Sequence, residues 1–275
     1  INSLNAQRNA QATQMSLSTS IQRLSSGLRV NSAKDDAAGL AIATRMDAQA
    51  RGMSVAIRNA NDGISMLQTA ESGMQTVSDM LQRMRELAVQ ATNSTNTSSD
   101  VASLNQEYTQ LASEIGRTIS AVQFNGTSVL TTTAGFDFQV GANSGQTITI
   151  ASGTLNLDQS TNVSAVVGGS TSALTTAAGS NSSNAANIDA IDKALQSIND
   201  SRAQLGAAQS RFQNTITFLQ SAVENQTAAK GRIMDADFAT ETSNLSRAQI
   251  LQQAGTAMLA QANQVPQQVL SLLKG

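Results

Sequence analysis

The sequence contains no histidine and no cysteine in its 275 residues. Histidine is the commonest general base and metal ligand in proteins, and cysteine supplies disulfides and thiolate metal sites. Their absence leaves carboxylates, lysine, tyrosine and serine as the side chains available for catalysis. We therefore expect no cofactor and no bound metal, and the composition does not favour an enzyme.

Aromatic residues are also scarce: they make up 3% of the chain, with no tryptophan and one tyrosine. Large aromatic side chains normally bury much of the area in a compact core. Their scarcity favours thin architectures, in which small residues pack with leucine, isoleucine and methionine along helix seams. The single proline, Pro266, lies near the C-terminus. Because proline is the main helix breaker, the rest of the chain is free to form very long helices.

Long apolar runs are missing as well, and a membrane crossing needs about 20 consecutive apolar residues. The first residues show no continuous apolar run of the kind found in a cleavable signal peptide. If the protein works outside the cell, we expect it to be exported without a cleavable signal peptide. The chain lacks an initiator methionine, so we expect it to be trimmed or processed. The net charge of -2 does not steer the chain to nucleic acid. Neither nucleic acid nor a membrane is an expected partner.

A heptad pattern dominates the first half of the chain. Small and aliphatic side chains alternate at spacings of three and four over residues 43–91, which is typical of a coiled-coil-like helix, here roughly 70 Å long. Three polar residues interrupt the seam: Glu71, Ser78 and Arg85. The seam itself consists of Ala43, Met46, Ala50, Met53, Ile57, Ala60, Ile64, Leu67, Met74, Leu81 and Ala88.

The pattern predicts further elements after this helix. A second helix over 101–122 is expected to be capped by Ser99 or Asp100 and to stop near Asn125-Gly126. Alternating apolar residues over 136–150 predict a β-hairpin. Residues 151–186 are rich in serine, threonine, glycine and alanine, and we interpret them as a surface insertion or poorly ordered loop.

A third long helix is predicted over 188–223, and the chain ends in another amphipathic helix. The two chain ends carry seams that neither can bury alone, so they are expected to pair with each other and with neighbouring subunits. The residues expected to carry this terminal assembly are Leu17, Ile21, Leu24, Leu28, Leu251, Met258, Val265, Val269 and Leu272.

These patterns predict a mainly α fold, with long coiled-coil-like helical rods from both chain ends and a small β-hairpin region. We expect residues 1–38 and 234–275 to form a terminal coiled-coil domain. Residues 39–150 and 187–233 are expected to form a helical rod domain with the hairpin, and residues 151–186 a short variable loop region.

Two groups of carboxylates leave an alternative open. Asp35-Asp36 and Asp235, Asp237 and Glu241 have the composition of a glycosidic acid–base pair or of a site for a hard cation. Both groups also precede predicted helices, where acidic residues stabilise the helix macrodipole. We favour a role as helix caps or turns.

The sequence around Leu87 does not fit the seam. Leu87 follows the helix pattern about 100° away from the seam position Ala88, and it shares a face with Arg83 and Gln90. From the residues alone, two explanations of Leu87 are equally good: it belongs to a second contact surface, or it is an ordinary exposed leucine.

Both chain ends resemble bacterial flagellin. The similarity rests on the runs IQRLSSGLRVNSAKDDAAG at 21–39, RNANDGIS at 58–65, QFNG at 123–126, SRAQILQQAG at 246–255 and LAQANQVPQ at 259–267. It covers about residues 1–150 and 187–275.

The resemblance implies a structural subunit that polymerises into the flagellar filament for swimming motility, outside the cell. It also implies partners: further copies of the chain, the filament cap and hook–filament junction proteins, an export chaperone, and a flagellin-sensing toll-like receptor. The receptor and subunit-interface surface of the family maps onto Gln82, Arg83, Arg85, Glu86, Leu87, Gln90 and Glu114. The first residues of a usual flagellin are missing.

Two other functions stay open at this point. A hook–filament junction protein would share similar ends but would not polymerise without limit. A binding module or adhesin would form stable monomers with ordered ends.

Overall fold

The computed structural model describes residues 2–158, 160–169, 173–175 and 181–273. The chain divides into two compact units, one made of Ile1–Ala50 with Val223–Gly275 and the other of Arg51–Ala222. We call them the terminal unit and the rod unit. The finer domain boundaries expected from the sequence stay a prediction.

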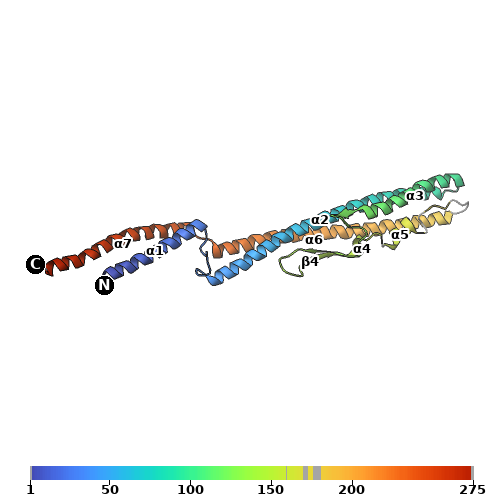
Figure 1. The fold of residues 1–275 in the computed structure, drawn as a ribbon. Helices are drawn as coiled ribbons and strands as arrows, with labels where there is room; N and C mark the ends of the chain where they lie inside the picture. Colours follow the sequence, from blue (N-terminus) through green and yellow to red (C-terminus); the bar gives the residue numbers. More distant parts are fainter. Residues whose placement is uncertain (1, 159, 170–172, 176–180, 274–275) are drawn as a thin grey trace. The chain divides into compact units, whose positions relative to one another are not determined.

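Helices dominate both units, as Figure 1 shows, and the predicted mainly α fold is confirmed. The elements in chain order are α1 (Asn2–Ser26), α2 (Ala37–Ala91), α3 (Ser98–Ala121), β1 (Gln123–Phe124), β2 (Thr127–Ser128), β3 (Phe136–Gln139), β4 (Thr147–Ile150), α4 (Ser152–Leu155), α5 (Thr161–Gly168), α6 (Asn181–Met234) and α7 (Phe238–Leu273). With 55 residues, α2 extends over about 80 Å. No helix in the described part of the chain is both long enough and apolar enough to cross a membrane.

The core of the rod unit lies where α2 is covered by two other helices. Arg83 Nε of α2 donates a hydrogen bond of 2.7 Å to Glu107 Oε1 of α3, whereas Arg85 Nε donates one of 2.7 Å to Asp192 Oδ1 of α6. The predicted seam is confirmed at Ala60, Leu67, Met74, Leu81 and Ala88, which are all buried.

Both explanations of Leu87 offered by the sequence place its side chain on the surface, but the side chain is buried. Its side chain is only 1% exposed and belongs to the same core as Leu81 and Met84. A single heptad seam describes the contact of one helix with one partner. Because α2 packs against two partner helices, α3 and α6, its buried stripe is wider than the seam. Leu87 is therefore a core residue of the isolated chain, and its place on the receptor and subunit-interface surface stays a prediction.

The two ends of α3 also differ from the sequence prediction. The cap is Thr97, whose side chain accepts a hydrogen bond from the amide of Asp100, while the Asp100 carboxylate accepts one from the amide of Thr97. This is a reciprocal capping box. Asn125 and Gly126 do not stop the helix, which ends at Ala121. They connect β1 to β2 and both have positive φ, 50° and 77°, as a type I′ hairpin turn requires.

The predicted β-hairpin is confirmed. Strands β3 and β4 pair antiparallel, with Phe136 opposite Ile150 and Phe138 opposite Ile148. One face of the hairpin packs on the helices, where the rings of Phe138 and Phe212 meet edge to face with centroids 5.5 Å apart.

The segment predicted to be a surface loop contributes to the core instead. Its two short helices and the residues around them bury five aliphatic side chains: Leu155, Leu157, Val163, Val166 and Leu174. These residues are few and widely spaced, so no periodicity revealed them. The residues that the structure describes therefore correct the prediction of a poorly ordered loop.

Three asparagines hold the end of this segment. The Asn105 side chain accepts a hydrogen bond from the amide of Leu174 (2.7 Å), and the Asn184 side chain accepts one from the amide of Thr175 (2.9 Å). The Asn187 amide group donates one to the carbonyl of Ala173 (3.0 Å). Backbone groups that have no strand partner are thus satisfied by side chains.

The terminal unit contains the connections next to α1 and α7. Helix α1 ends at Ser26, and Gly27 follows with a φ of 71°, which is favourable for a residue without a Cβ. The Gly27 carbonyl accepts a hydrogen bond from the amide of Ala236, and Arg29 donates two to the carbonyls of Met234 and Ile233. The two connections therefore lie side by side and are joined by backbone hydrogen bonds.

Candidate assembly surface on the terminal helices

Helices α1 and α7 form an antiparallel pair, visible in Figure 1. Near one end Arg23 meets Glu241. Further along, the Gln252 side chain contacts that of Gln14 at 3.4 Å. The chain ends therefore pair with each other, as the amphipathic pattern predicts.

The contact between these two helices is made largely by small and polar residues. Ser20 and Ala248 are buried, and a Cβ placed on Gly255 would lie 3.9 Å from that of Ala10. Small side chains allow the two helix backbones to approach closely. The seam therefore contributes little apolar burial.

The predicted assembly residues fall into three groups. Leu17, Leu24 and Leu28 are half-buried, as a seam position requires. The residues more than half exposed, contrary to a buried seam within one chain, are Ile21, Leu251 and Met258. Outside the residues whose side chains are described lie Val265, Val269 and Leu272. Within α7 the contact with α1 is made by small residues such as Ala248, whereas the larger Leu251 and Met258 stay exposed.

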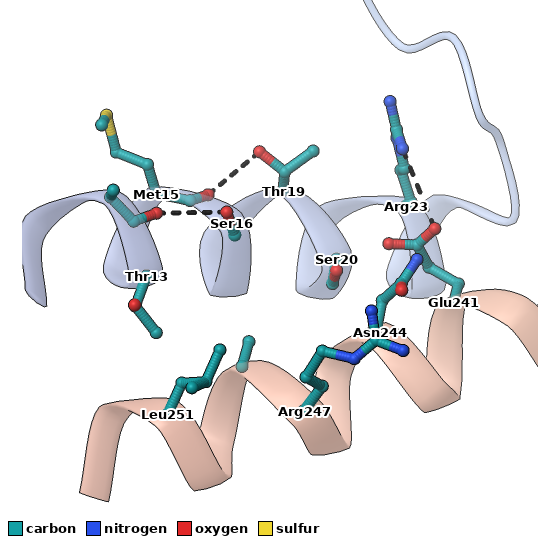
Figure 2. Close-up of a pocket in the computed structure, with 12 residues that line it drawn as sticks. Thr13, Met15, Ser16, Thr19, Ser20, Arg23, Glu241, Asn244, Arg247 and Leu251 are labelled. Atoms are coloured by element: carbon teal, nitrogen blue, oxygen red, sulfur yellow. Dashed lines mark hydrogen bonds and ion pairs between the residues drawn. The ribbon is translucent and has the colours of Figure 1, made fainter. Parts of the chain in front are cut away.

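A groove of about 690 Å³ lies between α1 and α7. Figure 2 shows Met15, Ser16 and Thr19 on α1, with Arg247 and Leu251 on α7. One part of the groove is thus polar and another apolar. Such a lining suits a protein segment better than a small charged ligand.

The polar end of the groove contains an ion pair. Arg23 Nη1 lies 3.8 Å from Glu241 Oε2, and the Glu241 side chain is only 9% exposed. Arg23 Nε is buried and makes no hydrogen bond within the described part of the chain. A buried donor without a partner costs about 1–3 kcal/mol, so an added acceptor in this groove would stabilise the pair.

Large apolar side chains are exposed along both terminal helices. The most exposed are Leu4, Met15, Ile21, Phe238, Ile250, Leu251 and Met258. A single exposed leucine is ordinary on a protein surface, but a set of this kind on one helix pair makes the pair a candidate interaction surface. The terminal unit of a single chain leaves this surface uncovered.

The carboxylates considered as a catalytic or cation site serve local structure. Asp36 Oδ1 accepts a hydrogen bond of 2.8 Å from the amide of Gly39 at the start of α2. Asp237 accepts from the amide of Ala239 and the hydroxyl of Thr240 at the start of α7. The interpretation as helix caps is confirmed at these two residues.

Hydrogen bonds lower the pKa of two of these carboxyls. The hydroxyl of Thr240 and nearby amides lower the pKa of Asp237 below its ordinary value. The amide and hydroxyl of Ser32 do the same for the pKa of Asp35. Both groups are stabilised as carboxylates. Within the described residues no three acidic side chains are grouped so as to hold a metal ion.

Comparison with known proteins gives the family. The model described as the bacterial flagellin N-terminal helical region matches residues 1–134, and that of the C-terminal helical region matches residues 188–273. The chain belongs to the bacterial flagellin family. Flagellins are structural proteins of the extracellular flagellar filament, and no known enzyme family is implied.

Individual flagellins are similar over nearly the whole chain. A flagellin of Halalkalibacterium halodurans is 46% identical, with 98% of this chain and 97% of that protein covered. The flagellar filament 33 kDa core protein of Treponema phagedenis is 40% identical, with 98% and 96% covered. The crystal structure of Bacillus cereus flagellin has 33% identity, covers 63% of this chain and 94% of that chain, and has a TM-score of 0.49.

The residues matched to the family's receptor surface are only partly brought together in this flagellin. Arg83 is half-exposed and donates hydrogen bonds to Glu107 of α3 and to Glu86. Glu114 pairs with Arg117 instead of Arg83. Gln82 and Gln90 are exposed, whereas Arg85 is bound to Asp192 of α6 and Leu87 is buried.

Glu107, which holds Arg83, was not among the residues predicted from the sequence. It lies seven residues before Glu114, so the two occupy the same face of α3. This spacing was the available signal, but only the structure identifies which of the two glutamates meets Arg83.

Proposed function

We propose that this chain is a subunit that polymerises into a helical flagellar filament used for swimming. The observation that supports the proposal is the set of exposed apolar side chains on α1 and α7, among them Ile21, Leu251 and Met258. Burying apolar surface contributes about 25 cal/mol per Å². Further copies of the chain are the partners that would cover this surface, and the role is structural rather than catalytic.

Polymerisation without limit requires a heterologous interface, in which a surface of one copy binds a different surface of the next. The groove between α1 and α7 is one surface, and exposed residues that do not line it, such as Ile21 and Ile250, supply a different one. A protein that binds one partner and then stops growing would not require both surfaces. The alternative of a junction protein is therefore distinguished by whether growth continues.

Deleting residues 246–275 tests the proposal. We expect the truncated chain to lose polymerisation, because the deletion removes most of α7, while the helical signal of the rod unit is retained in circular dichroism. Sedimentation of reassembled polymer measures the loss. Polymers formed by the truncated chain would refute the assembly role of α7.

Export and capping follow from the same function. We infer that the chain leaves the cell without a cleavable signal peptide, with help from an export chaperone, and that it contacts the filament cap and the hook–filament junction proteins. These partners rest on family membership alone. Secretion of the intact chain by cells with the export apparatus, and retention by cells without it, would test the route.

A second proposed role is that of a ligand for a flagellin-sensing toll-like receptor. Arg83 supports it, because its guanidinium is half-exposed yet held by Glu107 and Glu86. A positioned arginine loses little freedom on binding and is a frequent interface hot spot.

The Arg83→Ala substitution tests the receptor role. We expect monomeric R83A to need about tenfold more protein for half-maximal receptor signalling. Arg211→Ala, at an exposed arginine of α6, is the matched control and should signal normally. Unchanged signalling by folded R83A would remove Arg83 from the receptor surface.

A further inference from the structure

The methionines of this chain differ sharply in exposure. Met66, Met74 and Met84 are at most 2% exposed, in keeping with the usual role of methionine as a core-filling residue. Met15 and Met258 are 66% and 64% exposed. Both belong to the terminal helices, and the remaining four methionines are partly buried.

The two exposed thioethers belong to the helix pair that carries the exposed apolar residues. Met15 of α1 and Leu251 of α7 are both among the residues that line the groove. In Figure 2 Leu251 points toward α1, whereas the Met15 side chain points away from α7. Met258 follows Leu251 by seven residues and therefore occupies the same face of α7.

We propose that Met15 and Met258 are sites of reversible thioether oxidation that stops the unassembled chain from polymerising. The proposal rests on the function proposed above, because it assumes that assembly covers these exposed apolar residues. A sulfoxide is polar where a thioether is apolar, so oxidation places a strong hydrogen-bond acceptor on a surface that must lose its water.

The chemistry needs a peroxide as oxidant. A sulfur lone pair of methionine attacks one oxygen of hydrogen peroxide, and the O–O bond breaks. The sulfur loses two electrons and gains that oxygen, while the other oxygen leaves as water after proton transfer. A thiol-dependent sulfoxide reductase reverses the change: the sulfoxide oxygen leaves as water and two thiols become a disulfide.

Two features make the oxidation selective for Met15 and Met258: peroxide can reach their sulfur atoms, and the chain contains no cysteine. Peroxide must reach the sulfur atom, which the packing around Met66, Met74 and Met84 prevents in the folded rod unit. The chain has no cysteine that would react first. Once the proposed filament covers Met15 and Met258, they are protected as well, so only unassembled chain would be sensitive.

Oxidation of the monomer by hydrogen peroxide tests the sites. Peptide mass spectrometry over a time course should show Met15 and Met258 gaining oxygen at least about tenfold faster than Met66, Met74 and Met84. Similar rates at all five residues would overturn the assignment. This measurement does not involve polymerisation, so it stands even if the proposed function fails.

Seeded assembly of the same samples tests the consequence. We expect untreated chain to polymerise, oxidised chain to polymerise at least about fivefold less, and reductase treatment to restore assembly. The M15L/M258L double variant should assemble equally well before and after peroxide. If that variant assembles poorly without peroxide, recovery of the oxidised natural chain after reductase treatment decides the question.

The outcomes separate the two proposals. Failure of untreated chain to polymerise would contradict the filament function itself. Normal polymerisation by chain that carries both sulfoxides, with unchanged helicity, would leave that function intact and overturn the oxidation proposal.

Discussion

At the scale of single residues, burial decides what a side chain does. Leu87 has a polar sequence neighbourhood but is a core residue, because α3 and α6 both pack on α2. Arg83, four residues earlier, remains half-exposed and is fixed by two carboxylates. A change in signalling caused by substitution of Leu87 therefore reports on folding as well as on contact.

The Leu87→Ala substitution should lower the free energy of unfolding by about 2–5 kcal/mol, because it leaves a cavity in the rod core. Urea denaturation followed by circular dichroism measures the change. Val89→Ala is the matched control: Val89 is 48% exposed on the same turn of α2, and its change should stay within about 0.5 kcal/mol. Equal effects of the two substitutions would contradict the burial of Leu87.

Asp237 gives a prediction about pH. Its folded pKa is lowered by the Thr240 hydroxyl and by backbone amides, so the carboxylate stabilises the folded state above the unfolded pKa of about 3.9. This contribution is lost as the pH falls through the folded pKa. Asp237→Asn keeps a capping acceptor but removes the charge.

We therefore expect D237N to be less stable than the natural chain at pH 7, and the difference to disappear progressively below about pH 3.9. Thermal unfolding at a series of pH values measures it. Asp237→Ala, which lacks the cap itself, should retain a deficit in acid. A D237N deficit that stays constant into strong acid would show that the charge is not the cause.

At the scale of elements, close packing explains glycine within the long helices. A Cβ on Gly63 of α2 would lie 2.9 Å from Phe212 Cζ and 3.3 Å from Phe138 Cδ1. These two rings pack edge to face, so neither has room to move independently. Gly206 of α6, in contrast, has open space where a Cβ would be.

The same substitution should thus have opposite effects at the two positions. Gly206→Ala is expected to stabilise the chain by about 0.5–1 kcal/mol through helix propensity. Gly63→Ala is expected to destabilise it by about 1–3 kcal/mol, because overpacking displaces the rings. Urea midpoints measured side by side test both, and stabilisation by G63A would contradict the packing described for the hairpin.

The sequence predicted the helices and strands better than it predicted which parts of the chain pack against them. Heptad seams gave α2, α3 and α6, and alternation gave β3 and β4, because periodicity records which face of an element is buried. It does not record how many partners share that face, which is why Leu87 was misplaced. Residues 151–186 lack periodicity altogether, and the described part of this segment is held by partners such as Asn105 that are distant in sequence.

The candidate assembly surface was likewise predictable only in part. That the terminal helices pair was predictable from their apolar stripes, but which large apolar residues of those stripes stay exposed was not. Small residues such as Ser20 and Ala248 form much of the contact, whereas Leu251 and Met258, which were expected to carry the assembly, stay exposed. Large apolar residues left outside a helix pair are themselves the signal of a further partner.

At the scale of the whole molecule, stability and assembly should be separable. Leu251 is 51% exposed in the isolated chain, so Leu251→Ser should change the helicity and the unfolding midpoint little. It should nevertheless slow polymerisation strongly, because it places a hydroxyl on the surface that the proposed interface buries. Gln249→Ser, at an exposed polar residue of the same helix, is the matched control.

Turbidity and sedimentation with equal amounts of seed measure this difference. Polymerisation at the same rate by L251S and Q249S would show that the exposed residues of α7 lie outside the interface.

The most direct test of filament formation is electron microscopy of the concentrated chain, dissociated by acid or heat and returned to neutral pH with seed fragments. We predict long, uniform filaments that keep growing as more chain is added, as an open heterologous interface requires. Persistent monomers with ordered, fully helical terminal units would contradict the account.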